Sequence, residues 1–159
     1  NMGFFKKKTK ALYAMANGQS IAIEDVPDEV FATKMMGDGI AIQPKEGKIY
    51  APCNGKVTMV MDNTKHAVGI ENEDGMEILI HVGLDTVNLE GEGFDTFIQV
   101  GDEVKIGDLL ISYDKAGFEQ KGINDITMLV IVDPKDYKIT EYCSHQDVTI
   151  QTSAIIKYK

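Results

Sequence analysis

Short apolar or alternating runs recur about every 8–12 residues along the chain, and Gly, Asp and Asn separate them. This spacing is typical of an all-β domain, which we expect to be an antiparallel β-sandwich or barrel with short helical turns. Residues 115–121 are the clearest helical candidate, and residues 27–31 are expected to form a turn. The predicted strands are 19–24, 39–43, 48–51, 55–61, 66–71, 77–82, 97–100, 109–113, 128–132, 148–150 and 154–158.

The chain has 159 residues, of which 43% are hydrophobic and 26% charged, a balance typical of a globular protein with a packed core. We expect one domain over residues 11–159, preceded by a tail over residues 1–10. The formal net charge of -9 argues against a nucleic-acid partner, because phosphate backbones require a basic surface. It favours a protein partner with a basic docking patch.

No apolar run approaches the ~20 residues needed to span a bilayer, and residues 1–10 lack the apolar stretch of a secretory signal. Residues 2–8 place two Phe residues before three Lys residues, which allows at most weak contact with an anionic membrane. A solvated tail is the preferred interpretation. Cys53 and Cys143 form no CxxC pair, so we expect reduced thiols and a cytoplasmic location.

His66 and His81 flank a strong turn signal at residues 72–75, with β-rich sequence on both sides. A Glu73-Asp74 loop would place His66 opposite His81 in an antiparallel hairpin, and an Asp74-Gly75 loop would make them diagonal neighbours. Either register puts both rings on one face, with Cβ atoms about 5 to 8 Å apart. A three-residue loop without a bulge would put them on opposite faces, so the prediction requires an even loop.

The run from Glu77 to Val82 predicts which face that is. Ile78, Ile80 and Val82 form an unbroken apolar face that must point to the core. Leu79 shares the other face with His81. We therefore expect both histidines on a partly exposed face.

Two chemistries use such a pair of imidazoles. In one, both bind a metal such as zinc together with a third ligand. In the other, one ring nitrogen attacks phosphorus and the second imidazole hydrogen-bonds the phosphoryl oxygens. Imidazole suits this second role because its pKa near 6.5 leaves a neutral nucleophile at about pH 7. The pattern alone leaves both open.

The motif ILIHVGLDTV around His81 is similar to the active-site signature of glucose-family enzyme IIA (EIIA) proteins of the bacterial sugar phosphotransferase system. Four further segments resemble that family, and the similarity is strongest from Val26 to Asp114. The start of the chain resembles its free-standing members. The four segments are GDGIAIQP at 37–44, APCNG at 51–55, TKHA at 64–67 and LEGEGF at 89–94.

The resemblance implies a β-sandwich with a shallow apolar depression and a phosphotransferase component that works through a phosphohistidine. His81 would accept the phosphoryl group on Nε2 from the phosphocarrier HPr and donate it to a cysteine of the EIIB domain of a sugar permease. His66 would steady the phosphoryl group. Thr64 would orient His66, since a hydroxyl can hold one ring nitrogen.

The same resemblance implies a docking surface for these partners and requires no cofactor. Apolar residues would form a dry rim around the histidines, and two acids would meet basic side chains of HPr. The rim residues are Phe31, Met35, Met36 and Leu79, and the acids are Asp28 and Asp85.

Three features depart from the enteric members of that family: Lys65 in place of Asn, Leu79 in place of Phe, and a poorly matching segment at 133–137. They leave the transfer chemistry intact but put in doubt regulatory partners known from enteric relatives, such as adenylate cyclase, transporters or glycerol kinase. The alternative hypothesis is a non-enzymatic regulatory module, in which His66 and His81 bind zinc at a partner interface.

Overall fold

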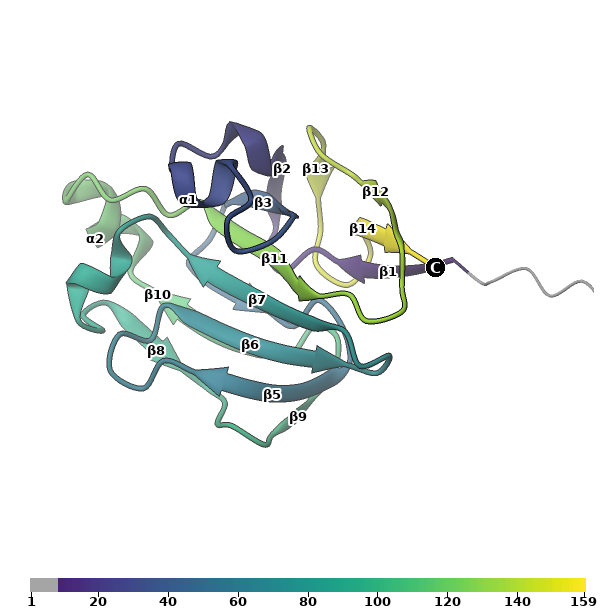
Figure 1. The fold of residues 1–159 in the computed structure, drawn as a ribbon. Coiled ribbons are helices and arrows are strands. Elements are labelled where there is room, and N and C mark those ends of the chain that lie inside the picture. Colours follow the sequence, from purple (N-terminus) through teal and green to yellow (C-terminus); the bar gives the residue numbers. More distant parts are fainter. Residues whose placement is uncertain (1–8) are drawn as a thin grey trace, which may run out of the picture.

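The computed structural model describes residues 9–159, so the expected weak membrane contact of residues 2–8 lies outside the described residues. Within 9–159, eight strands form one antiparallel sheet in the order β13-β2-β3-β11-β7-β6-β5-β9 (Figure 1). Its strands are β2 Gly18–Ala22, β3 Gly39–Pro44, β5 Gly55–Val60, β6 Ala67–Asn72, β7 Glu77–Val82, β9 Glu103–Val104, β11 Thr127–Asp133 and β13 Asp147–Val148.

Two smaller antiparallel sheets complete the described fold, in the orders β4-β10-β8 and β1-β14-β12. Their strands are β4 Lys48–Tyr50, β10 Leu109–Tyr113, β8 Phe94–Thr96, β1 Lys10–Tyr13, β14 Ala154–Tyr158 and β12 Ile139–Tyr142. The helical pieces are short: η1 Ile23–Asp25, α1 Glu29–Ala32, η2 Thr86–Leu89 and α2 Lys115–Gln120. None of the helices in the described part is long and apolar enough to cross a membrane.

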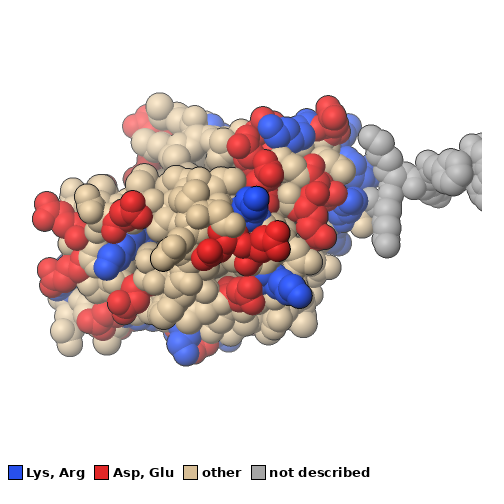
Figure 2. All heavy atoms as spheres, turned by 90° about the horizontal axis from the view of Figure 1, so that it is seen from below, with Lys and Arg blue, Asp and Glu red and all other residues tan. Residues whose placement is uncertain are grey.

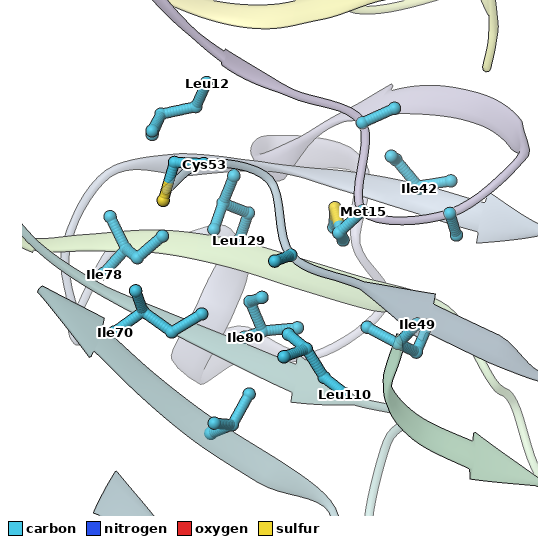
Figure 3. Close-up of a cluster of buried hydrophobic side chains, with 14 of the residues drawn as sticks. Leu12, Met15, Ile42, Ile49, Cys53, Ile70, Ile78, Ile80, Leu110 and Leu129 are labelled. Atoms are coloured by element: carbon cyan, nitrogen blue, oxygen red, sulfur yellow. The ribbon is translucent and has the colours of Figure 1, made fainter. Parts of the chain in front are cut away.

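The main core lies between the large sheet and the two small ones. Figure 3 shows Ile78 and Ile80 of β7 facing Leu12 from β1, Ile49 from β4 and Leu110 from β10. Each buried aliphatic side chain contributes about 1.5–3 kcal/mol relative to exposure. This packing of sheet on sheet confirms the predicted antiparallel β-sandwich.

A second apolar cluster, the outer cluster, lies on the other face of the large sheet. The region of η1 and α1 contributes to this cluster, and Asp28 caps α1 by accepting a hydrogen bond from Val30 N (2.9 Å). As expected from the alternation in β7, Leu79 belongs to this outer cluster while its neighbours Ile78 and Ile80 belong to the main core. The outer cluster consists of Ile23, Val26, Phe31, Ala41, Ala67, Leu79, Ile126, Met128 and Val130.

Several element boundaries differ from the sequence prediction. The predicted strand 97–100 is wrong: β8 covers Phe94–Thr96, and the chain then turns at Gly101, whose φ is 96°. Residues 27–31 hold the start of a helix and not only a turn. The strands β1, β9 and β12 were not predicted, since each is short or weakly alternating. The predicted helix at 115–121 is confirmed as α2.

Candidate functional site

The hairpin between β6 and β7 closes with a three-residue loop, Glu73-Asp74-Gly75. Asn72 N donates to Met76 O (2.9 Å), and the Asn72 side chain accepts a hydrogen bond from Met76 N (3.0 Å). The resulting register sets Ala67, and not His66, opposite His81. Both even-loop registers predicted from the sequence are therefore wrong.

His66 nevertheless meets His81. The two ring centroids lie 4.7 Å apart with the planes at 87°, an edge-to-face contact. His66 precedes the first residue of β6, and Lys65 before it has a left-handed φ of 59°. The strict alternation of a strand therefore does not fix the direction of this side chain. The backbone still docks against β7, because Val82 N donates to His66 O (2.7 Å).

The His66 side chain lies deeper than the sequence suggested, since the residue is only 4% exposed. Burial lowers the pKa of His66, and the backbone of Thr64 offsets part of that effect. Burial also lowers the pKa of His81, to about 4, with a further decrease from the adjacent His66 and a partial offset from Gly83 and Asp28. Both imidazoles are therefore neutral near neutral pH.

The two nitrogens of His81 have different surroundings. Nδ1 is buried and has no hydrogen-bond partner among the described residues, although the backbone of Gly83 lies near enough to raise the pKa. The ring of His81 nevertheless lines the pocket. Because Nδ1 is buried, we expect Nε2 to be the ring nitrogen that meets a group entering the pocket.

The low pKa of His81 predicts a dependence of stability on pH. Between about pH 4 and pH 6.5 the unfolded chain binds a proton on His81 that the folded chain does not, so the free energy of unfolding falls as the pH falls through this window. The difference amounts to roughly 3 kcal/mol. Urea unfolding at pH 7 and near pH 4 should show a smaller acid-induced loss for His81→Gln than for the native chain. Equal losses would contradict the shift.

The two histidines line a shallow pocket of about 190 Å³. Phe31 packs against His81, with ring centroids 4.9 Å apart and planes tilted by 59°. The mouth carries apolar side chains that are unusually exposed: Val30 is 42% exposed, Met36 40% and Val87 49%. The pocket is lined by Asp28, Val30, Phe31, Met36, His66, His81, Asp85, Thr86 and Val87.

The structure brings most of the predicted site residues together. Asp28, Phe31, Met36 and Asp85 line the pocket with the two histidines. Leu79 does not line the pocket, because it is buried beneath in the outer cluster.

Met35 also lies outside the pocket lining, and at 73% exposed it projects into solvent. The sequence prediction missed Val30, Thr86 and Val87 as pocket residues. For Thr86 and Val87, their place directly after His81-Val82-Gly83-Leu84-Asp85 was the available signal.

Thr64 lies behind His66 and not in the pocket lining. Its Oγ1 is 2.8 Å from His66 Nδ1, which is hydrogen-bonding distance. If the hydroxyl donates this bond, the single proton of the neutral ring resides on Nε2. That arrangement makes His66 Nε2 a hydrogen-bond donor.

The pair alone is a poor metal site. Within residues 9–159 there is no group of three or more His, Cys, Asp or Glu side chains that could hold a metal ion. Two imidazoles fill half of a tetrahedral zinc site, so zinc binding would need ligands from a partner. Zinc at a partner interface therefore stays a prediction.

Comparison with known proteins identifies the family. The family model described as "phosphoenolpyruvate-dependent sugar phosphotransferase system, EIIA 1" matches residues 10–137. The chain is 44% identical over 150 residues to a "PTS system glucose-specific EIIA component" from Oceanobacillus iheyensis, covering 91% of this chain and 90% of that protein. It also resembles the solved structure of glucose permease IIA from Mycoplasma capricolum, with a TM-score of 0.85, 34% identity and coverage of 96% and 98% of the two chains. The chain therefore belongs to the EIIA 1 family of the phosphoenolpyruvate-dependent sugar phosphotransferase system.

Proposed function

We propose that this chain accepts a phosphoryl group from phospho-HPr on Nε2 of His81 and donates it to a cysteine of the EIIB domain of a sugar permease. In the first step a bond forms between Nε2 and phosphorus, and the bond from phosphorus to the histidine of HPr breaks. In the second step the cysteine sulfur attacks, and the bond between Nε2 and phosphorus breaks. The observation that carries this proposal is the neutral, edge-to-face pair of imidazoles in an open pocket.

The environment of His81 suits a carrier that must both accept and release. Its low pKa keeps the ring neutral and nucleophilic at about pH 7. A ring nitrogen of low basicity is also a better leaving group, which favours onward donation. The half-buried position limits access of water, and this slows loss of the phosphoryl group by hydrolysis.

His66 is the proposed stabiliser of the phosphoryl group. Its ring edge lies against His81, and with its proton on Nε2 it would donate a hydrogen bond to a phosphoryl oxygen. Thr64 acts on this reaction only through His66, since its hydroxyl holds the opposite ring nitrogen. Thr64 is thus a positioning residue.

Thr64→Val should slow donation to EIIB by about tenfold, because His66 Nδ1 loses its partner and the ring its preferred tautomer. Acceptance from phospho-HPr should change less. Rapid-quench measurement of the two half-reactions separates these effects, and Thr64→Ser, which keeps the hydroxyl, should restore the native rate. Equal rates for Thr64→Val and the native chain would remove Thr64 from the mechanism.

The rim of the pocket supports protein partners. Val30, Met36 and Val87 expose apolar surface around a site that carries Asp28 and Asp85. An apolar patch flanked by carboxylates fits an apolar surface with basic side chains.

Acidic groups with scattered lysines also surround an uncharged area on the side of β5 and β9 (Figure 2), in agreement with the net charge of -9. Such a surface speeds encounter with a basic partner.

The proposal is tested by incubating the chain with phosphoenolpyruvate, enzyme I and HPr. Intact mass spectrometry should then show one added phosphoryl group, which disappears when a permease with its EIIB domain and sugar are supplied. Glucose is the first sugar to test, since both similar proteins carry glucose in their names. Absence of the added group under conditions that phosphorylate HPr would refute the proposal.

A further inference from the structure

A buried carboxylate, Asp125, lies at the centre of a polar network that the transfer chemistry does not use. Its Oδ1 accepts a hydrogen bond from Gln43 Nε2 (2.6 Å). Its Oδ2 accepts hydrogen bonds from Tyr113 (2.7 Å) and from Lys115 Nζ (2.7 Å). Asp125 is only 7% exposed, so this network replaces the water that the carboxylate lost on folding.

The network ties the stretch from β10 to β11 to the distant strand β3. Gln43 belongs to β3, Tyr113 to β10 and Lys115 to the first turn of α2, while Asp125 lies two residues before β11. Burial would raise the pKa of Asp125, but the hydrogen bonds from Lys115, Tyr113 and Gln43 outweigh it and lower the pKa. The carboxylate is therefore charged and firmly held at about pH 7.

The residues on either side of Asp125 hold the chain that follows His81. Asn124 O accepts a hydrogen bond from Leu84 N (2.9 Å), and Ile126 O accepts one from Gly83 N (2.9 Å). Residues 83–87, here called the site wall, include Asp85, Thr86 and Val87, which line the pocket.

The site wall depends on its hydrogen bonds to Asn124 and Ile126, whereas His81 is held by the sheet. His81 lies within β7, paired with Ala67 of β6 on one side and Met128 of β11 on the other. Residues 124–126 lie outside any strand, because the regular pairing of β11 with β7 ends at Thr127 and Val82, and their backbone bonds to Gly83 and Leu84 tie them to the site wall itself. The side chain of Asp125 anchors these residues to β3, β10 and α2.

The site wall also fits tightly. A Cβ atom on Gly83 would lie 2.4 Å from the Thr86 side chain and 3.1 Å from Asn124 O, and the φ of Gly83 is 79°. Thr86 Oγ1 donates to Val82 O (2.5 Å) and fixes the start of η2. A shift of residues 124–126 would therefore move the site wall as a unit.

We propose that Asp125, held by Gln43, Tyr113 and Lys115, is a positioning residue that fixes the site wall beside His81. The effect on phosphoryl transfer rests on the proposed function, whereas the effect on the site wall itself does not. Loss of the carboxylate should loosen the hydrogen bonds at Gly83 and Leu84 while His81 stays in its strand.

The test compares Asp125→Asn with Asp74→Asn. Asp74 is a matched control, because its carboxylate also accepts hydrogen bonds from a lysine, Lys10 (2.6 Å), and a tyrosine, Tyr158 (2.7 Å). It lies in the hairpin loop, at the opposite end of β7 from His81. Both variants should lose stability. Only Asp125→Asn should speed amide hydrogen exchange at Gly83 and Leu84, by about tenfold or more under conditions where the chain stays folded.

In the transfer assay, Asp125→Asn should lower the rate of phosphoryl acceptance by about tenfold, and Asp74→Asn should leave it within about twofold of native. If Asp125→Asn does not fold, Lys115→Met gives the same comparison, because Lys115 is part of the network and its side chain is 24% exposed. Equal exchange at Gly83 and Leu84 in both variants would overturn the inference. A native chain that takes no phosphoryl group would instead refute the proposed function, and the exchange measurement would still decide the role of Asp125.

Discussion

His81→Gln should abolish phosphoryl acceptance, with a fall of at least ~1000-fold in the rate of labelling by phospho-HPr. Glutamine keeps a polar side chain of similar reach next to Phe31 but offers no nucleophilic ring nitrogen. The pocket and its apolar rim should therefore stay intact while the chemistry is lost. Labelling is measured with ³²P-phosphoenolpyruvate, enzyme I and HPr, followed by separation of the proteins.

The matched control is His145→Gln. His145 is the third histidine of the chain, exposed, with its Nε2 3.7 Å from Asp25 and outside the pocket lining. This variant should be labelled at the native rate. Labelling of His81→Gln at a rate near that of His145→Gln would show that His81 is not the acceptor.

His66→Gln should separate the two half-reactions. His81 keeps its place in β7 and its nucleophilic nitrogen, so the variant should still accept the phosphoryl group. Donation to EIIB should fall by about 100-fold, because the hydrogen bond from His66 to the phosphoryl oxygens strengthens as charge develops during transfer. Single-turnover transfer from the isolated phosphoprotein to EIIB measures this step directly.

The test of His66 compares the rate of phosphoryl acceptance with the rate of donation in the same variant. A variant that fails to accept at all would give His66 a role in the nucleophile itself, contrary to its assignment as stabiliser. A variant that donates at the native rate would make His66 a structural residue that merely fills the space behind His81. If His66 is the stabiliser, Thr64→Val should show the same loss in donation in weaker form. If His66 is only structural, Thr64→Val should donate at the native rate.

The pairing of the two histidines was predictable from the sequence only through family resemblance. Both hairpin registers that place the two histidines together require an even loop, yet the loop has three residues. The Asn72 side chain, which accepts hydrogen bonds from the N–H groups of Asp74 and Met76, stabilises this longer loop. His66 reaches His81 because it lies just before β6, where strand alternation does not apply. The alternation of side chains along a strand does not predict the direction of a side chain outside the strand.

Other parts of the fold followed directly from local pattern. The alternation in β7 correctly separated Ile78 and Ile80 from Leu79, because a strand between two apolar layers must divide its side chains between them. The burial of His66 was not predictable in this way. It depends on the packing of the folded chain, as does the contact between Phe31 of α1 and His81. The network around Asp125 was missed for the same reason, since Gln43, Tyr113 and Lys115 meet it only in the folded chain.

The most direct test of the central claim is to locate the phosphoryl group in the native protein. The chain, labelled with ¹⁵N at its histidines, is phosphorylated through enzyme I and HPr and observed by ³¹P and ¹⁵N NMR. A single phosphoryl group bonded to Nε2 of His81, with the proton of His66 on its own Nε2, is the predicted result. A phosphoryl group on Nδ1 of His81, on His66 or on a side chain outside the pocket would contradict the mechanism.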